Sequence, residues 1–294
     1  MKKLDDFIEL ARKKENSVIA VAAAEDKDVL TSIMEGEKLG ICTAILVGNE
    51  VKIREIALEI GMSLDKHKIV NIEDSVYACE VATKFVSSGE AAALMKGLID
   101  TSYVLKAALN KEWGLRTGSV MSHIAVYELA TYKKPLFLTD AAININPDFE
   151  TKKQIIENSI KAIQNIGVEK PKVGLICAKE KVNPKMQSTV DADELSKVFA
   201  DREDCVVEGP IALDGAISKE ACDIKGIDTK IGGDVDLLVL DNIEAGNALY
   251  KALTYLAGGK NGGVVLGTSR PVILTSRSDS SHTKLISMAL GLLM

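Results

Sequence analysis

The sequence predicts an α/β protein with a mostly parallel sheet, built as two interleaved α/β lobes. Strand-like and helix-like segments alternate through most of the 294 residues, the order that produces right-handed β-α-β crossovers. The predicted strands are short runs of Ala, Val, Ile and Leu, as in strands that helices cover on both faces. Hydrophobic residues make up 47% of the chain and aromatic residues only 4%, which fits the same kind of core. A chain of this length can bury one large core or two smaller ones, and we expect two.

Helix and strand signals alternate regularly in the first third of the chain. Apolar residues at helical spacing predict helices, and short apolar runs predict buried strands. Gly40, Gly61 and Gly89 follow three of the predicted helices, as is common at helix ends. The predicted elements are an amphipathic helix at the start of the chain, strands over 17–23, 41–47 and 91–95, and helices over 26–39, 51–60 and 73–87.

The middle of the chain departs from this alternation. Strand-like segments over 118–127 and 135–138 follow each other with no long helix between them, so we expect part of the sheet to be antiparallel there. Regular alternation then resumes. The predicted elements are helices over 149–166, over 184–199, from 214 onward and over 244–256, and strands over 172–177, around 206–207 and over 235–240.

The domain organisation depends on where the tail returns. No internal repeat or low-complexity linker is visible, which favours interleaved lobes over two successive domains. We therefore place the first lobe at 1–135 together with 268–294, and the second lobe at 136–267. The tail then crosses back to complete the sheet of the first lobe.

A glycine-dense segment over 257–268 fits neither common phosphate-binding fingerprint. It lacks the G-x-x-x-x-G-K-[ST] of a P-loop, and no G-x-G-x-x-G stands between a strand and a helix. We interpret Gly258 to Gly263 as a tight turn that leads into a strand over 264–266. A backbone cradle for an anion stays open as the alternative.

Composition excludes several classes of protein. The net charge of −6 and the isoelectric point near 5.3 argue against nucleic-acid binding, which needs a basic surface, but leave room for a small anion in a local field. The five cysteines are scattered and form no C-x-x-C pair, which indicates free thiols in a reducing compartment. We see no signal peptide and no apolar run long enough to span a membrane. We expect a cytoplasmic protein.

The most informative segment is the tail. Pro271 can begin a strand, the apolar run over 272–274 continues it, and Ser276, Arg277 and Asp279 follow at its carboxyl end. Ligands bind at that edge of an open α/β sheet. Hydroxyls, a guanidinium and the unpaired backbone N–H groups of a first helical turn suit an anion such as phosphate. The structural alternative is a helix start with Ser or Asp as N-cap. Both interpretations can hold together, because a cap and an anion use the same N–H groups.

Polar residues follow two other predicted strands. Asp140 and Asn144 come after the strand that ends at 138, and Asp241 and Asn247 come after the strand over 235–240. Turn chemistry explains Asp140 and Asn144 as well as ligand binding does. Glu208 and Asp214 come after the strand around 206–207 in the same layout as Asp241 and Glu244 after the next strand, although Asp214 also suits a helix cap. Acids at the carboxyl edge in these two consecutive units favour a lined cleft over independent helix caps.

The three histidines give weak signals. His67, His123 and His282 form no H-x-x-x-H or H-x-E pattern, so a histidine-based metal site is not expected. His123 either faces the cleft or is a hydrogen-bonded core residue. No G-x-S-x-G elbow is present, which argues against a serine hydrolase.

Four segments together resemble the phosphate acyltransferases, the family of phosphate acetyl- and butyryltransferases. They are the segments over 139–147, 208–214, 240–251 and 270–277, which occur in the family's order along nearly the whole chain. The segment over 115–126 is more similar to the butyryl branch. The resemblance implies two α/β lobes with an active-site cleft between them, similar to the isocitrate dehydrogenase architecture, and a homodimer or larger homo-oligomer.

The resemblance also implies the reaction. An acyl group, butanoyl preferred, passes reversibly from CoA to inorganic phosphate, which gives an acyl phosphate and free CoA. CoA and phosphate are then substrates, with no bound cofactor, no metal, no nucleic acid and no membrane as partners. A bidentate Arg suits phosphate, and well-placed donors stabilise the tetrahedral oxyanion. When CoA attacks an acyl phosphate, its thiol must lose a proton, because the thiolate is the nucleophile.

The family's Ser-Arg pair falls on Ser276 and Arg277, which implies that Arg277 binds phosphate and Ser276 helps hold the transition state. The acetyl branch has an Asp base where Thr283 stands, and the nearest acid here is Asp279, our third catalytic candidate. The acetyl branch also has an Arg at Lys106 and a Cys at Ala141, so no cysteine need be catalytic. The substrate-binding candidates are Lys106, Arg116, Ser122, His123, Asp140, Asn144, Asn247, Thr268 and Lys284.

Three other functions stay open. A phosphate acetyltransferase would use the same chemistry with a smaller acyl pocket. A decarboxylating dehydrogenase on a similar fold would need NAD and a metal held by acids such as Asp236, Asp241 and Glu244, and the chain lacks the glycine fingerprint for NAD. A non-catalytic CoA-binding protein would bind CoA without turnover.

Overall fold

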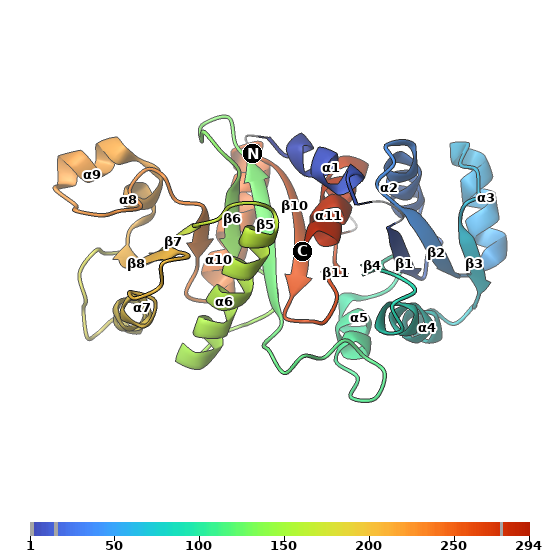
Figure 1. Cartoon of the computed structure of the whole chain (residues 1–294), viewed down its shortest axis with the longest axis horizontal. Coiled ribbons are helices and arrows are strands. Elements are labelled where there is room, and N and C mark those ends of the chain that lie inside the picture. Colours follow the sequence, from blue (N-terminus) through green and yellow to red (C-terminus); the bar gives the residue numbers. More distant parts are fainter. Residues whose placement is uncertain (1–2, 15–16, 277–278) are drawn as a thin grey trace. The chain divides into compact units, whose positions relative to one another are not determined.

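The computed structural model describes residues 3–14, 17–276 and 279–294 and has a mixed α/β fold (Figure 1). The chain divides into two compact units. One comprises Asp5–Ser119 with Gly262–Met294 and is called the terminal unit. The other comprises Val120–Asn261 with the first residues of the chain and is called the middle unit.

The strands of the terminal unit are mostly parallel. Their order is β3-β2-β1-β4-β11-β10, and only the β10–β11 pair is antiparallel, with Val265 opposite Val272. β11 pairs parallel with β4, so the strand of the tail does return to the strands of the first third of the chain. The bounds are β1 Val18–Ala22, β2 Thr43–Gly48, β3 Lys68–Asn71, β4 Ala93–Lys96, β10 Lys260–Leu266 and β11 Val272–Ile273.

Helices cover both faces of these strands. α1, α2 and α11 pack together on one side, and α4 and α5 lie on the other (Figure 1). Side chains of the N-cap residues Asp26, Asn49, Asp74 and Ser280 accept a backbone N–H from the first turn of α2, α3, α4 and α11, which satisfies a donor that the helix cannot. The bounds are α1 Asp5–Arg12, α2 Lys27–Lys38, α3 Glu50–Ile60, α4 Ser75–Ser87, α5 Thr101–Ala108 and α11 Ser281–Leu293.

The middle unit has strand order β5-β6-β9-β7-β8, in which β5 and β6 are antiparallel and the remaining pairs are parallel. The antiparallel pair confirms what the missing helix between these segments predicts. The strands are β5 Ser122–Glu128, β6 Leu136–Thr139, β7 Lys172–Ile176, β8 Val206–Ile211 and β9 Leu237–Val239. The helices are α6 Phe149–Asn165, α7 Gln187–Val198, α8 Leu213–Ile217, α9 Lys219–Lys225, α10 Ile243–Lys251 and the π-helical turn η1 Ala252–Leu256.

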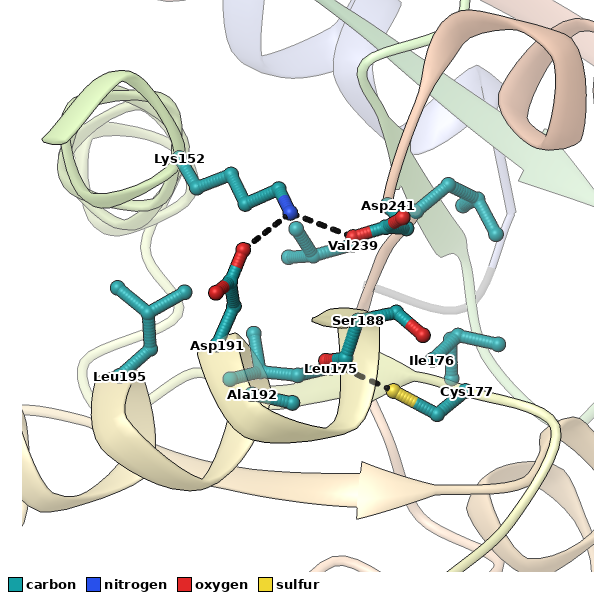
Figure 2. A pocket seen from close by; sticks show the side chains of 11 residues that line it. Lys152, Leu175, Ile176, Cys177, Ser188, Asp191, Ala192, Leu195, Val239 and Asp241 are labelled. Carbon is teal, nitrogen blue, oxygen red and sulfur yellow. Dashed lines mark hydrogen bonds and ion pairs between the residues drawn. The ribbon is translucent and has the colours of Figure 1, made fainter. Parts of the chain in front are cut away.

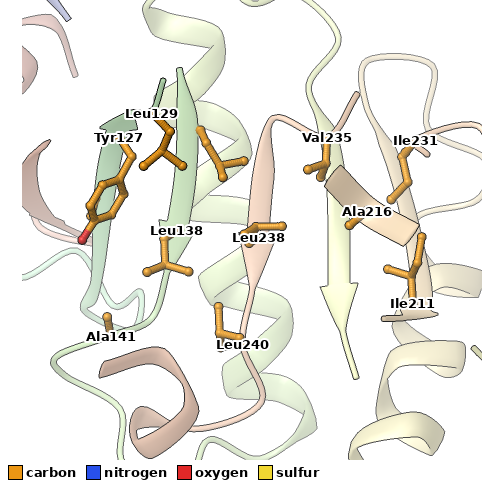
Figure 3. Close-up of a cluster of buried hydrophobic side chains, with 12 residues drawn as sticks. Tyr127, Leu129, Leu138, Ala141, Ile211, Ala216, Ile231, Val235, Leu238 and Leu240 are labelled. Carbon is orange, nitrogen blue, oxygen red and sulfur yellow. The ribbon is translucent and has the colours of Figure 1, made fainter. Parts of the chain in front are cut away.

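The core of the middle unit lies between its strands and its helices. Tyr127, Leu138 and Leu238 are among its buried members (Figure 3). Tyr127 has no exposed surface, and its hydroxyl donates a hydrogen bond to the Tyr250 carbonyl oxygen at 2.8 Å. Leu249, Tyr250 and Leu253 pack from α10 and η1 against this core, so one face of that helix is anchored.

Two elements, β3 and α5, are absent from the elements that the sequence analysis predicts. β3 is a four-residue edge strand with both ends exposed, too short to display a period. α5 does carry a signal, since Val104, Ala107 and Ala108 are buried at helical spacing after its N-cap residue Asp100.

The tight turn expected for Gly258 to Gly263 is wrong in its second half. Gly258 has φ +63°, as a turn requires, but β10 already begins at Lys260. A Cβ at Gly262 would lie 2.6 Å from Ile286 Cγ2. The strand is glycine-rich because α11 packs directly on its backbone.

Among the residues that the structure describes, no helix combines the length and the apolar character that a membrane crossing needs.

Candidate active site

The turn between β11 and α11 carries the strongest prediction. Thr275 is buried, Ser276 is exposed, and α11 begins after its N-cap Ser280, whose hydroxyl accepts the Thr283 N–H at 3.1 Å. The predicted helix start at the carboxyl end of a strand is therefore confirmed. Arg277 lies outside the described residues.

Asp279 and Lys284 hold this turn together. The Asp279 carboxylate accepts the Ser276 backbone N–H at 2.6 Å, and the Asp279 N–H donates to the Ser276 carbonyl oxygen at 3.1 Å. Lys284 is only 2% exposed, and its ammonium donates to the carbonyl oxygens of Asp279 at 2.5 Å and Ser276 at 3.4 Å. These contacts bracket position 277 from both sides.

The structure also brings together two predicted residues that are far apart in the sequence. Arg116 and Thr268 form an isolated antiparallel bridge, and the Thr117 hydroxyl donates to the Gly267 carbonyl oxygen at 2.6 Å. Arg116 is exposed, and the Thr268 hydroxyl donates to the Arg270 carbonyl oxygen. Lys106 is exposed on α5 of the same unit.

The turn after β6 gathers the predicted residues of the middle unit. Asp140 is 4% exposed, and its carboxylate accepts the backbone N–H groups of Ala142, Ile143 and Asn144 at 2.9, 3.1 and 3.3 Å. It also accepts the Asn144 side-chain amide at 2.6 Å, and that amide donates to the Met121 carbonyl oxygen at 2.8 Å. The contacts of Asp140 and Asn144 in the structure are therefore those of a turn.

Asn247 reaches the same turn from α10, where its side-chain amide donates to the Ala141 carbonyl oxygen at 3.2 Å. A Cβ at Gly246 would lie 2.3 Å from the Asp140 carbonyl oxygen, so only glycine allows α10 to approach this closely.

Ser122 and His123 are buried on β5, beside this turn. The Ser122 hydroxyl lies 3.4 Å from the Asn158 amide. The His123 ring packs edge-to-face on Tyr250 at 6.1 Å. Ser122, His123, Asp140, Asn144 and Asn247 thus form one neighbourhood of the middle unit.

A buried ion cluster in the middle unit is missed by the sequence reasoning. The Lys152 ammonium, on α6, lies 2.7 Å from Asp191 of α7 and 2.5 Å from Asp241, which follows β9 (Figure 2). Burial opposes the charged form, but the hydrogen bonds and charges of the two carboxylates outweigh it and raise the pKa of Lys152. A signal existed, because Lys152 falls on the same helical stripe as Ile155, Ile156 and Ile163, all buried.

A cavity of about 20 Å³ beside this cluster has room for about one water molecule, far too little for CoA or phosphate. Cys177 lines it, with its thiol donating to the Ser188 carbonyl oxygen at 3.4 Å (Figure 2). Burial raises the pKa of Cys177 to about 11, so the thiol stays protonated near neutral pH.

Two of the three acids considered as metal ligands, Asp236 and Asp241, are paired with lysines. Asp241 contacts Lys152, and Asp236 lies 2.5 Å from Lys134 while it also accepts the Lys172 N–H. Within the ranges 3–14, 17–276 and 279–294, no group of three or more His, Cys, Asp and Glu side chains is arranged to hold a metal ion.

Comparison with known proteins covers the whole chain. The family model described as "Phosphate acetyl/butaryl transferase" matches residues 4–80 and 76–292. The chain is 47% identical to the phosphate butyryltransferase of Clostridium acetobutylicum, over 100% of this chain and 98% of that protein. It is 39% identical to the phosphate acetyltransferase of Thermotoga maritima, over 98% of each chain.

A solved structure supports the same assignment. The branched-chain phosphotransacylase of Enterococcus faecalis V583 superposes with a TM-score of 0.85 at 34% identity, covering 94% of this chain and 98% of that one. Sequence and fold therefore agree over nearly the full length, and the chain belongs to the Phosphate acetyl/butaryl transferase family.

Proposed function

We propose that this protein is an acyltransferase that moves an acyl group, butanoyl preferred, reversibly between CoA and inorganic phosphate. The observation that carries the proposal is the 47% identity to a phosphate butyryltransferase over the full length of both chains. CoA, acyl-CoA, acyl phosphate and phosphate are then substrates, and no resident cofactor is needed. The scattered free thiols support a cytoplasmic location.

The proposed chemistry balances without a metal or redox partner. A phosphate oxygen attacks the thioester carbonyl carbon and forms a C–O bond, while the carbonyl oxygen becomes the oxyanion of a tetrahedral intermediate. Collapse of the intermediate breaks the C–S bond and releases CoA as a thiolate, which takes up a proton. Donors aimed at the oxyanion contribute most when they are held rigidly in place.

In this proposal Arg277 binds the phosphate dianion through its planar guanidinium, and Ser276 donates to the oxyanion. The hydrogen bonds among Ser276, Asp279 and Lys284 support these roles, because they fix the backbone on either side of Arg277. Asp279 then acts chiefly by holding the turn, since its carboxylate already accepts the Ser276 N–H at 2.6 Å.

A general-base role for Asp279 can be separated from a positioning role. Asp279→Asn keeps an oxygen that can accept the Ser276 N–H but cannot take a proton from the CoA thiol. We expect this variant to keep most of its kcat with butyryl phosphate and CoA, and to keep the shape of the pH–rate profile. Loss of activity together with loss of the acidic limb of that profile, where a carboxylate base becomes protonated, would assign Asp279 as the base.

The direct test is thiol release from butyryl-CoA, followed with and without inorganic phosphate. Phosphate-dependent release supports acyl transfer to phosphate. Thiol release that does not depend on phosphate points to a thioesterase. No thiol release with any acyl-CoA overturns the proposal in favour of the CoA-binding or dehydrogenase alternatives.

A phosphate acetyltransferase is the second candidate, because the Thermotoga maritima relative carries that name at 39% identity. Ranking acetyl-, propionyl- and butyryl-CoA by kcat/KM separates the two. One methylene changes binding by only about 1–3 kcal/mol, so neighbouring chain lengths will overlap in rate.

A further inference from the structure

Lys96, the last residue of β4, is a buried cation to which the proposed chemistry gives no role. The residue is only 6% exposed, and its ammonium lies 3.4 Å from the carbonyl oxygen of Gly97. Lysine is seldom buried to this extent, because loss of water penalises its charged form. Lys96 also lies at the carboxyl end of a strand in a mostly parallel part of the sheet, the edge at which α/β folds bind ligands.

The pairing of β4 with β11 places Lys96 beside the strand that leads to Ser276. In this parallel pair Met95 lies opposite Ile273, so Ser276 is two residues farther along than Lys96 in register. Residues 274–276 form neither a helix nor a turn. With about 3.3 Å per residue and about 4.8 Å between strands, the two Cα atoms are about 8 Å apart. The flexible four-carbon stem of the lysine covers most of that distance.

Alternation along the strands decides which face of the sheet Lys96 occupies. A Cβ at Gly291 of α11 would lie 3.0 Å from the Ile273 side chain, so Ile273 and its neighbour Met95 face α11. Lys96 follows Met95, so its side chain points to the opposite face, on which α4 and α5 lie (Figure 1). By the same alternation Ser276, three residues after Ile273, also points away from α11.

A second buried lysine approaches the same strand end from α11. Lys284 is 2% exposed, and its ammonium lies 3.4 Å from the Ser276 carbonyl oxygen. The ammonium groups of Lys96 and Lys284 therefore flank the end of β11 from the two faces of the sheet. The Asp279 carboxylate, which accepts the Ser276 N–H, supplies one negative charge there. A strand end between two buried cations suits a dianion such as phosphate.

The end of β4 is held rigidly against the end of β1. The Gly97 N–H donates to the Ala22 carbonyl oxygen at 2.8 Å, and the Leu98 N–H donates to the Ala23 carbonyl oxygen at 2.7 Å. A Cβ at Gly97 would lie 2.1 Å from the Ala23 carbonyl oxygen, so only glycine allows this approach. Ala23 has φ +53°, a left-handed conformation that is strained for a residue with a Cβ. Such strain collects at functional sites, and rigidly held charges stabilise an anion best.

We propose that Lys96 is a catalytic residue whose ammonium binds the phosphoryl group of inorganic phosphate and of the acyl phosphate. This inference rests on the proposed function, in which the two phosphoryl groups occupy the same place in the two directions of the reaction. The phosphates of CoA are separated from its thioester by the pantetheine arm, whereas Lys96 lies beside the proposed catalytic residue Ser276. Lysine binds phosphate as a point charge, so Lys96 neutralises the dianion and transfers no proton.

The kinetic test compares wild type with Lys96→Met in both directions of the reaction. Methionine removes the charge and keeps a long side chain, so KM for phosphate and KM for butyryl phosphate should each rise roughly 10-fold or more. KM for butyryl-CoA and KM for CoA should change less than about twofold, because they report a different part of the substrate. Lys96→Arg keeps the charge and should recover part of the lost affinity. Lys68→Met, which removes an exposed lysine of β3 in the same sheet, is the matched control.

A binding measurement separates this inference from the proposed function. Phosphate added at constant ionic strength should raise the melting temperature of wild type and of Lys68→Met, but not that of Lys96→Met, because a ligand stabilises the folded state that binds it. A wild type that phosphate stabilises, but that releases no thiol from any acyl-CoA, overturns the proposed reaction and keeps the anion site. A wild type that shows neither effect overturns both.

The role of Lys96 is overturned if Lys96→Met, folded by circular dichroism, keeps the wild-type KM for phosphate and the wild-type gain in melting temperature. A rise in KM for CoA and butyryl-CoA alone would also overturn it, since the lysine would then bind a phosphate of CoA. Should Lys96→Met fail to fold, Lys96→Gln, which keeps an N–H donor for the Gly97 carbonyl oxygen, carries the same comparison.

Discussion

At the scale of single residues, Lys284 illustrates how the role of a charged group depends on its neighbours. The sequence predicts a lysine that contacts substrate. In the structure its ammonium is buried and donates to the carbonyl oxygens of Asp279 and Ser276. The contacts of this cation are therefore those of a group that holds the turn.

Lys284→Met is expected to lower both stability and turnover. The methionine side chain cannot donate a hydrogen bond, so the carbonyl oxygens of Asp279 and Ser276 lose their donor. This loss lowers the free energy of unfolding by about 1–3 kcal/mol. Because the contacts between Ser276 and Asp279 loosen, kcat for butyryl-CoA phosphorolysis should fall more than KM for butyryl-CoA rises. Urea unfolding and steady-state kinetics measure the two effects, with the exposed Lys52→Met as control. Unchanged kcat in a destabilised variant would limit Lys284 to a structural role.

Arg277→Ala is expected to reduce kcat/KM for phosphorolysis roughly 100-fold or more, because a charged donor to the reacting phosphate is lost. The melting temperature should stay near that of wild type. Arg277→Lys keeps the charge without the planar fork and should recover only part of the rate. Arg54→Ala, which removes an exposed arginine of α3, is the surface control. Wild-type kinetics in Arg277→Ala would remove this residue from the mechanism.

At the scale of elements, the Lys152 cluster links two helices and a strand end. Asp191 comes from α7 and Asp241 from the end of β9, and the Gln187 amide also donates to Asp191 at 2.7 Å. The strand-end acid Asp241, which the sequence suggests as a cleft residue, is therefore tied to α6. Asn242 next to it caps α10, so the cluster also fixes where the helix that carries Asn247 begins.

Lys152→Met is expected to destabilise the protein by about 3–5 kcal/mol, because it leaves the two partly buried carboxylates of Asp191 and Asp241 without their cation. Lys161→Met, an exposed lysine on the same helix, should change little. The pKa of Lys152 is raised in the folded state, so its stabilisation is complete at neutral pH and is lost only as the pH rises above the ordinary lysine value of about 10.4.

Denaturant unfolding at pH values from neutral to strongly alkaline measures how the free energy of unfolding changes with pH. Wild type should lose stability above that value more steeply than Lys152→Met does. Equal slopes for the two proteins would mean that the cluster does not hold the lysine charged.

Element prediction succeeds where one face carries a long period and fails where it does not. The spacing of Ile155, Ile156 and Ile163 predicts α6, and the missing helix between two strand runs predicts the antiparallel β5–β6 pair. β3 is too short for any period. The π-helical turn η1 cannot be distinguished from the end of an α-helix by composition.

At the scale of the whole molecule, the five cysteines are unpaired and at least partly buried. Cys42, Cys79, Cys205 and Cys222 are buried, and Cys177 is partly buried. Burial raises the pKa of Cys42 to about 12 and that of Cys79 to about 11. Those two thiols therefore resist ionisation, and the thiolate is the reactive form.

We expect the native protein at pH 7.5 to react very slowly with a thiol reagent, and to keep full phosphorolysis activity after that exposure. Unfolding in denaturant should then expose all five thiols to rapid reaction. Counting modified thiols by absorbance and by mass measures both. Fast loss of activity on modification of one native thiol would contradict the absence of a catalytic cysteine.

Several predictions about the whole molecule stay predictions. They are the lobe boundaries at 135 and 267, the isocitrate dehydrogenase-like arrangement and the individual roles of the site residues. The family itself is secure, because sequence motifs spread over the chain and the fold of a phosphotransacylase agree along nearly its full length.

The sequence by itself determined the α/β class, the elements with clear periods, the return of the tail to the first strands and the family. These follow from local patterns and from motifs that chemistry restricts to a few residue types. Only the tertiary structure decided that Asp140 bonds its own turn, that Lys152 joins Asp191 to Asp241, and that Gly246 and Gly262 exist for close packing. Those outcomes depend on which distant groups come within hydrogen-bond or van der Waals distance, and no local pattern encodes that distance.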